Sequence, residues 1–439
     1  MPTSLSRRTG LVLTVTASIA VTAACSSSKG TASAPASAST STAASSAAVS
    51  APATSSAASS PASVSSAAAA SSSGPTGSAP ATSQATVKVG LLFPYSGPAA
   101  SYGKLFNQAV EAGQQVVQGH FGTEVNLKTS QEDSMNTAQG ATTAMNALVS
   151  VDNVDVALTS GTAPGLAALP IAKSAGIPLI NGSAADPKLA DPSGTIINLA
   201  PLADQQVKPL IPYVVNTKGL KKIAIIHTTD ALGSTLDSQV KTAVAAAGGQ
   251  VAIDLSVAPT LTNFSVQASL IASHNVDAIY LASSVGVVQY APIYSQFRSA
   301  GLNQVMLGFN ALHVPQVMSL PGVSGSLLVD QVINLQADNW ATTAFNAAWA
   351  KINPTQQPTP YVVDYVNAII LIAEATDALV KQGATVDGKS LQAALHALPG
   401  AIVVGGTVTI AADGTTNVPL AVYELTGSGG SKVVQNITG

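Results

Sequence analysis

The sequence predicts an α/β fold made of two doubly wound parallel-sheet lobes. Short apolar segments alternate with helical patterns from residue 86 onward, and the same alternation restarts after Leu202. Strands separated by helices of this length form parallel sheets through right-handed crossovers. Residues 86–439 are long enough for two such lobes, each with its own core.

The first run of elements opens on a mostly apolar segment, 87–93, which predicts a buried strand. Apolar residues at helical spacing predict a helix over 109–118, and Gly119 suits its end. The elements expected next are a strand at 125–128, a helix at 138–149, a strand at 154–158, a helix at 166–174 and a strand at 177–180.

The second run begins with a strand at 223–227 and a helix at 232–247. Ser234 stands three residues before Asp237 at the start of this helix, and Gly248 and Gly249 follow its end. The pattern continues as a strand at 251–257, a helix at 264–273, a strand at 278–281, a helix at 287–300 and a strand at 305–308.

The C-terminal part departs from this alternation. Helices are expected at 361–380 and 391–398, and two strands, 407–410 and 418–425, flank a turn signal at 412–415 and predict a hairpin. These late elements must dock on the earlier sheets, so the chain crosses between the lobes more than once. The expected domains are lobe 1 at 86–201, completed by about 333–400, and lobe 2 at 202–332, completed by about 401–439.

The N-terminus has the pattern of a signal peptide over residues 1–24. Arg7 and Arg8 precede an apolar stretch that is shorter than the roughly 20 residues of a membrane span. Thr22-Ala23-Ala24-Cys25 resembles a bacterial lipobox, which implies lipidation of Cys25 and anchoring on the extracytoplasmic face of the cell membrane. The alternative is an ordinary secreted protein. It is disfavoured because Cys25 is the only cysteine and has no partner for a disulfide.

Residues 25–85 read as a tether. The segment is almost wholly Ser, Ala, Thr, Pro and Gly. Such a composition cannot bury enough apolar area to offset chain entropy, so it predicts disorder. A flexible coil of about 60 residues spans roughly 40–45 Å. Its Ser, Thr and Pro content also suits O-glycosylation.

Composition excludes several classes of function. After Arg7, Arg8 and Lys29, the chain has 15 basic residues against 21 acidic ones, which argues against a nucleic-acid partner. The sequence has no Gly-x-Ser-x-Gly elbow and no phosphate loop. No two histidines stand at metal-ligand spacing among His120, His227, His274, His313 and His396. We therefore expect no enzyme, no cofactor and no metal.

Three segments carry a resemblance to a known family. Residues 87–103, which contain Tyr-Ser-Gly-Pro at 95–98, are followed by 159–187 with Pro-Leu-Ile at 178–180, and then by 222–233. Together they resemble type I periplasmic binding proteins of the leucine/isoleucine/valine-binding (branched-chain amino acid) family. The resemblance implies solute receptors that serve an ATP-driven (ABC) importer. It also implies two lobes joined by a three-crossover hinge that close on a solute.

The residues support a binding site between the lobes. Ser96, Thr162 and Ser183 each follow a predicted strand, and ligands of doubly wound sheets bind beyond the carboxyl ends of strands. Free N–H groups at the following helix N-terminus favour an anion, so a carboxylate can be held without arginine. Turn formation and helix capping are alternative roles for Ser96 and Thr162.

The resemblance assigns further site residues. It implies that Thr162 and the Ser183 backbone face a solute carboxylate, and that Tyr102 and Tyr361 form aromatic walls, with lobe packing as their alternative role. It places Leu232 and Ser284 where the family has aromatic side chains. The implied ligand-binding set is Ser96, Tyr102, Thr162, Ser183, Leu232, Ser284, Asn310 and Tyr361.

Departures from the family pattern bear on the solute. Asn310 stands where the family pairs an acidic side chain with the solute ammonium, and Ala185 replaces a hydroxyl. A buried ammonium without an anion costs several kcal/mol, so an α-amino acid is disfavoured against an amide or a short carboxylate. Asp230 and Asp186 are alternative sources of the charge, although helix capping and an Asp-Pro turn account for them as well.

The combined prediction is a monomeric, lipid-anchored, extracytoplasmic solute-binding protein. It captures a small polar solute (an amino acid, amide or short carboxylate) by hinge closure and delivers it to an ABC permease in the membrane. The alternative is a receptor of the same fold that senses a solute for a membrane kinase or chemoreceptor. Solute identity is left open.

Overall fold

The computed structural model describes residues 84–283 and 285–437, and the predicted signal peptide, Cys25 and Ser284 lie outside these residues. In the described part of the chain, the first sheet has five parallel strands in the order β2-β1-β3-β4-β5. They are β1 (Ala85–Phe93), β2 (Val125–Asp133), β3 (Val156–Thr159), β4 (Leu179–Asn181) and β5 (Ile196–Asn198). The connecting elements are α1 (Ala100–Phe121), α2 (Ala138–Ala147), η1 (Leu148–Asp152), α3 (Thr162–Ala175) and η2 (Pro187–Leu189).

The second sheet has seven strands among the described residues, in the order β14-β13-β10-β9-β8-β6-β7. They are β6 (Lys222–Thr228), β7 (Gln250–Val257), β8 (Ala278–Ala282), β9 (Val305–Gly308), β10 (Leu327–Gln331), β13 (Leu420–Leu425) and β14 (Ser431–Ile437). Its helices are α4 (Ala203–Pro212), η3 (Tyr213–Thr217), α5 (Ala231–Ala246), α6 (Ser265–Ala272), α7 (Val287–Ser299), η4 (Asn310–Leu312) and α8 (Pro315–Met318).

The two sheets share one topology. The parallel strands β7-β6-β8-β9-β10 repeat the order of the first sheet, and β13 and β14 extend the second sheet in antiparallel fashion. The prediction of two doubly wound parallel-sheet lobes is therefore confirmed. Central strands such as β3 and β8 are buried along their whole length, as expected where helices cover both faces of a parallel sheet.

Three connections between described elements cross from one lobe to the other. The first, at 199–202, joins β5 to α4, and the second, at 332–339, joins β10 to α9 (Trp340–Ile352). The third, at 409–419, joins β12 (Gly406–Val408) to β13 and runs beside the first, because the Thr416 hydroxyl donates to the Asn198 carbonyl at 2.8 Å. These connections form the three-crossover hinge.

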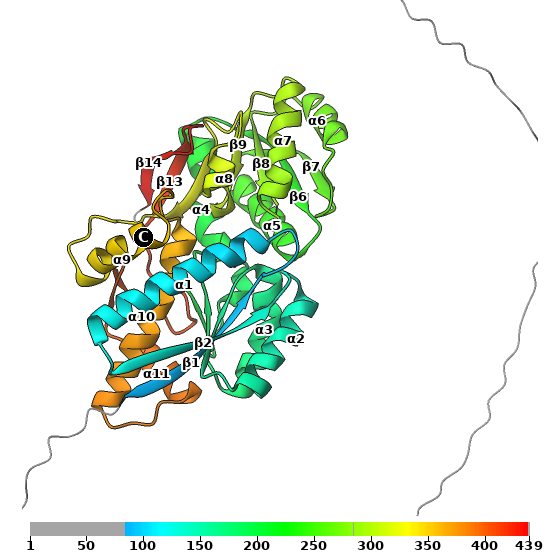
Figure 1. Cartoon of the computed structure of the whole chain (residues 1–439). Helices are drawn as coiled ribbons and strands as arrows, with labels where there is room; N and C mark the ends of the chain where they lie inside the picture. The colour runs from blue at the N-terminus through cyan, green and yellow to red at the C-terminus, as the bar shows by residue number, and fades with distance from the viewer. Residues whose placement is uncertain (1–83, 284, 438–439) are drawn as a thin grey trace, which may run out of the picture. The chain divides into compact units, whose positions relative to one another are not determined.

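Late helices complete the first lobe. α10 (Pro360–Lys381) lies along α1, as Figure 1 shows, and α9 and α11 (Gly388–Ala397) pack beside this pair. Gly113 of α1 permits the close approach, since a Cβ there would lie 2.8 Å from the Ile369 Cβ of α10. Among the described residues, no helix combines the length and apolar character needed to cross a bilayer.

The predicted C-terminal hairpin forms only as a single antiparallel bridge, between Ile410 and Thr416, and its two predicted strands otherwise pair elsewhere. Strand β12 pairs with β11 (Ala401–Val403) through a turn at Val404 and Gly405, where glycine accepts a φ of 92°. The turn signal at 412–415 does form a turn, but that turn lies within the third crossover. Residues 401–408 contact α9 and α10, and the chain joins the second sheet only at Leu420.

Tyr365→Phe is expected to lower the free energy of unfolding by about 1–2 kcal/mol. The buried Tyr365 hydroxyl on α10 donates to the Thr159 carbonyl at 2.9 Å and lies 3.1 Å from Ser183 Oγ, so it ties α10 to the ends of β3 and β4. Tyr280→Phe is the matched control, because the Tyr280 hydroxyl is buried and has no hydrogen-bond partner among the described residues. Urea denaturation should show no loss for the control; equal losses in both variants would contradict this assignment.

Candidate functional site

A cavity of about 400 Å³ is lined by residues of both lobes. Most of its lining follows the carboxyl ends of parallel strands, which is the place where doubly wound sheets bind ligands. These residues are Pro94 after β1, Asn136 after β2, Ser160 and Gly161 after β3, Ser183 after β4, Asp230 and Leu232 after β6, and Phe309 and Ala311 after β9. The volume is in the range of small-molecule sites.

The lobe 1 wall of the cavity contains the N-terminus of helix α3. Gly161 is its N-cap residue with φ of 77°, and no side chain caps the helix. The Gly161 N–H donates to Ser183 Oγ at 3.3 Å, and Thr162 Oγ1 accepts the Ala185 N–H at 3.4 Å. Thr162 and Ala163 line the cavity, and their N–H groups have no side-chain cap, while Pro164 has no N–H; the two N–H groups make this end of the helix suited to an anion.

The remaining walls are largely apolar and aromatic. Tyr102 and Phe106 of α1 have ring centroids 5.9 Å apart, and Tyr361 of α10 meets Phe106 edge-on at 6.4 Å. Burial raises the pKa of Tyr102 to about 12, so its phenol is neutral at physiological pH. Gly286 of lobe 2 meets Tyr102 closely, since a Cβ there would lie 3.1 Å from the phenol oxygen.

Asp230 is the one charged side chain among the described residues that line the cavity. Its Oδ1 accepts the Gly233 N–H at 3.0 Å and the Thr228 hydroxyl at 3.2 Å, so it caps α5 as the sequence suggested. Within the same described lining there is no Lys, Arg or His. An anionic solute would therefore be held by helix N–H groups and hydroxyls.

The structure brings together five of the predicted site residues: Tyr102, Thr162, Ser183, Leu232 and Tyr361 all line the cavity. Ser96 and Asn310 do not belong to its lining. Ser96 is exposed and its N–H donates to Asp133 Oδ1 at 3.3 Å. Asn310 is 2% exposed behind the lining residues Phe309 and Ala311, and its N–H donates to Gln206 Oε1 at 2.8 Å.

Several lining residues were not predicted. Met135, Asn136 and Thr137 come from the loop between β2 and α2, and Ser160 precedes the α3 cap. Ligands bind at strand ends, so a correct prediction of where β2 ends would have pointed to this loop. The predicted strand stops at 128, whereas β2 continues to Asp133.

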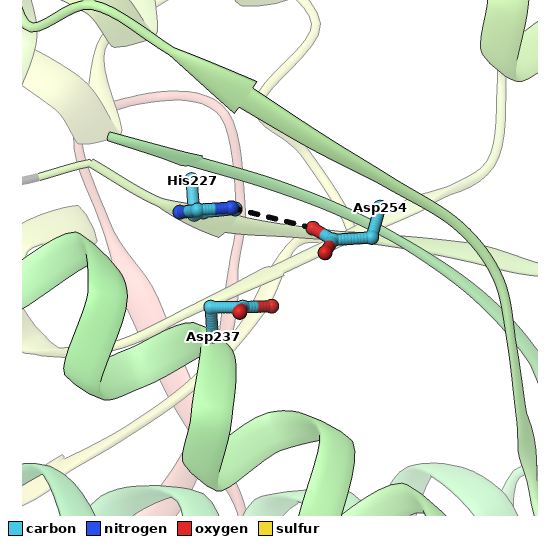
Figure 2. Close-up of side chains that lie close together, drawn as sticks. All are labelled: His227, Asp237 and Asp254. Atoms are coloured by element: carbon cyan, nitrogen blue, oxygen red, sulfur yellow. Dashed lines mark ion pairs between the residues drawn. The ribbon is translucent and has the colours of Figure 1, made fainter. Parts of the chain in front are cut away.

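His227 lies at the end of β6, within a polar cluster separate from the cavity (Figure 2). Its Nδ1 is 3.1 Å from the Thr228 carbonyl oxygen, and its Nε2 is 3.4 Å from Asp254 Oδ1. His227, Asp237 and Asp254 offer ligand atoms close enough together to hold a metal ion. The Lys241 ammonium already bonds to both carboxylates, at 2.8 Å and 2.5 Å, and these bonds raise its pKa.

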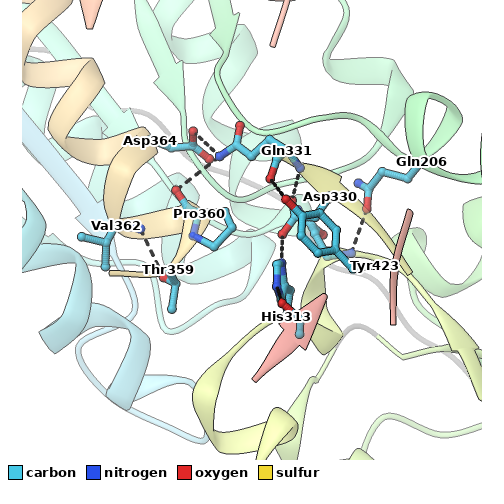
Figure 3. A network of polar contacts seen from close by, with 11 residues as sticks. Gln206, His313, Asp330, Gln331, Thr359, Pro360, Val362, Asp364 and Tyr423 are labelled. Carbon is cyan, nitrogen blue, oxygen red and sulfur yellow. Dashed lines mark hydrogen bonds and ion pairs between the residues drawn. The ribbon is translucent and has the colours of Figure 1, made fainter. Parts of the chain in front are cut away.

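Two buried acids lie where the lobes join (Figure 3). Gln331, at the end of β10, donates its Nε2 to Asp364 Oδ1 of α10 at 2.7 Å and to the Pro360 carbonyl at 3.3 Å. Its backbone N–H donates to Asp330 Oδ1 at 2.8 Å, and Asp330 Oδ2 is 2.9 Å from His313 Nδ1. Burial raises the pKa of both carboxyl groups, and raises that of Asp364 well above its usual value.

Known proteins share this sequence pattern and fold. The family model described as periplasmic binding protein matches residues 86–431. The Leu/Ile/Val-binding protein homolog 3 of Brucella melitensis is 24% identical over 341 residues, which cover 76% of this chain and 88% of that protein.

Solved structures of other solute-binding proteins have the same fold. The leucine-binding protein LivK of Thermotoga maritima aligns with a TM-score of 0.70 at 18% identity, over 80% of this chain and 99% of that one. LivJ of Streptococcus pneumoniae, in complex with isoleucine, gives the same values. A solute-binding protein of R. palustris in complex with benzoate gives 0.67 at 20% identity, over 80% and 96%.

The family consists of binding proteins that act outside the cytoplasm, not of enzymes. The matched region spans the first sheet, the second sheet up to the start of β14, and the three connections between the lobes. This chain therefore belongs to the type I periplasmic binding proteins of the leucine/isoleucine/valine-binding family.

Proposed function

We propose that this protein captures a small solute between its lobes and delivers it to an ABC importer. The observation that carries the proposal is that strand ends of both lobes line one and the same cavity. Because the chain passes between the lobes through crossing connections, a solute bound to one lobe can gain contacts from the other on closure. The similarity to ABC transporter solute-binding proteins supports this role.

The proposed solute is a short carboxylate with an apolar body. The uncapped N-terminus of α3 suits the carboxylate, and Tyr102, Phe106 and Tyr361 suit an aliphatic or aromatic body. An α-amino acid would need an anion for its ammonium. Asp230 is the acid at the described lining, and its carboxylate already caps α5.

The proposal includes a lipid anchor. The lipobox-like segment 22–25 and the Ser/Ala/Thr-rich segment that follows it supply an attachment point and a tether. An importer in the membrane would then meet a receptor that stays near its surface. We propose that the closed form is the one that docks on the permease, as a monomer.

Solute binding is expected to raise the melting temperature of the protein. A ligand at 100 times its Kd stabilises the folded state by about 2.7 kcal/mol. Thermal-shift screening should cover short aliphatic and aromatic carboxylates, their amides and the branched-chain amino acids. Small-angle scattering with each hit should show compaction; a panel that gives neither stabilisation nor compaction would refute the proposal.

A further inference from the structure

The loop between β2 and α2 is held in a conformation that ordinary residues rarely adopt. Met135 and Asn136 are consecutive non-glycine residues with φ of 51° and 54°. This left-handed region suits asparagine better than methionine. The loop is fixed by Asp133 Oδ1, which accepts the Met135 N–H at 2.8 Å, and by Ser134 Oγ, which accepts the Asn136 N–H at 3.3 Å.

The strained loop presents the amide of Asn136 to the cavity. A Cβ on Gly161 would lie 2.4 Å from Asn136 Oδ1, so the amide rests directly against the residue that caps α3. Asn136 lines the cavity, and its side chain has no hydrogen-bond partner among the residues described. Strain of this kind clusters at ligand sites, where it positions a group in advance.

Ser160, on the other side of Gly161, is also left with a free polar group. It is 2% exposed and lines the cavity, and within the described chain its Oγ has no partner of acceptable hydrogen-bond geometry. The Tyr365 hydroxyl lies close enough to interact, but its hydrogen goes to the Thr159 carbonyl, so it can at most accept from Ser160 and the lone pairs of Ser160 Oγ receive no hydrogen from it. A buried hydroxyl without a partner is costly, so a ligand that satisfies it gains affinity.

We propose that Asn136 and Ser160 form a subsite for a neutral hydroxyl carried next to the solute carboxylate. Both side chains are neutral and can donate and accept, which matches a hydroxyl. Both flank Gly161, so the group they bind lies close to the carboxylate that the α3 N-terminus would hold. The structure thus assigns the solute to the 2-hydroxy acids. This inference rests on the proposed function.

The test compares acids that differ only at the carbon next to the carboxylate. Mandelate, phenylacetate and phenylglycine carry a hydroxyl, a hydrogen and an ammonium there. Lactate, propionate and alanine form a smaller set. Calorimetric titration of the whole protein should give at least about tenfold tighter binding of the hydroxy acid than of the matched acid without it.

Two variants locate this preference. Asn136→Gly removes the amide, and glycine adopts the left-handed φ of this position without strain. Ser160→Ala removes the hydroxyl. Each should reduce the hydroxyl preference to about threefold or less, because the hydroxy acid loses more affinity than the deoxy acid does. Asn153→Gly is the control, because Asn153 also has a left-handed φ, 53°, and lies outside the cavity lining.

The outcomes separate the two proposals. If the wild-type protein binds none of these acids or their longer homologues, the proposed carboxylate function itself fails. If it binds them without a hydroxyl preference, or binds the amino acid most tightly, only the subsite is overturned. Equal losses for hydroxy and deoxy acids in Asn136→Gly and Ser160→Ala would also overturn it.

Discussion

Gly161→Ala is expected to weaken solute binding by at least about tenfold. The new Cβ would lie 2.4 Å from Asn136 Oδ1, a separation that real Cβ atoms do not show, so Asn136 or the first turn of α3 must move. Either movement displaces groups that line the cavity, which are the N–H groups of α3 and the Asn136 amide. The combination of a φ of 77° with a ψ of 144° is open almost only to glycine, and it adds a backbone cost of about 1–3 kcal/mol.

Gly176→Ala is the control that separates the backbone cost from the displacement of cavity-lining groups. Gly176 caps the other end of α3 with a φ of 68°, and a Cβ there would meet nothing within 4 Å. Both variants should lose stability in urea, and Gly161→Ala should lose more, because it adds a clash to the backbone cost and its φ of 77° and ψ of 144° are less accessible to alanine than the left-handed 68° and 33° of Gly176. Only Gly161→Ala should lose affinity in titrations with a solute found by the thermal-shift screen. Unchanged affinity in Gly161→Ala would show that this end of α3 does not face the solute.

Buried central strands were readable from the sequence, whereas edge strands were not. The apolar segment at 87–93 predicted β1, and 278–281 predicted β8, because both faces of these strands are covered. β2 lies at the edge of its sheet, and its second half, Thr129–Asp133, is polar and only partly buried. Hydrophobic periodicity therefore could not show that the strand continues to the cavity. The three-residue β5 was too short to stand out.

Helix α1 shows how packing overrides local signals. The sequence predicts a helix only over 109–118, where apolar residues recur at helical spacing. The helix nevertheless starts at Ala100, and Gly103 is required there, since a Cβ would lie 2.1 Å from the Pro94 carbonyl oxygen. This close contact between α1 and the end of β1 places Tyr102 at the cavity. No local pattern contains that information.

A site residue could be predicted from the sequence where it follows a strand and its alignment with the family is certain. Thr162 and Ser183 satisfied both conditions and line the cavity. Asn310 was placed by matching the family without gaps. Its two neighbours, Phe309 and Ala311, line the cavity, whereas Asn310 is buried in the protein. An alignment error of one residue therefore replaces a cavity-lining residue with a core residue. Asn136 and Ser160 acquire their significance only from contacts across the fold.

Asp364→Asn is expected to stabilise the protein increasingly as the pH rises. Burial, together with the nearby Asp330, raises the pKa of Asp364 well above its usual value, although the Gln331 hydrogen bond opposes this. Among the described residues no cation pairs with Asp364, and its Oδ2 has no hydrogen-bond partner. The folded protein therefore holds the proton more tightly than the unfolded chain does.

The sign of the pH dependence follows by linkage. A carboxyl group whose pKa is higher in the folded state favours folding at low pH. This contribution is lost as the pH rises from the unfolded value, about 3.9, through the folded one. An amide at position 364 can still accept the Gln331 hydrogen bond and has no such loss. The variant should gain about 1–3 kcal/mol over wild type by pH 8, or several degrees in Tm.

Asp387→Asn provides the control for this experiment. Asp387 caps α11, and hydrogen bonds from Ser390 lower its pKa, so it is ionised throughout the range from pH 5 to 9. Asparagine caps helices about as well as aspartate. The difference in Tm from wild type should therefore stay flat for Asp387→Asn and grow with pH for Asp364→Asn. A flat difference in both variants would mean that Asp364 is not the group that binds the extra proton in the folded state.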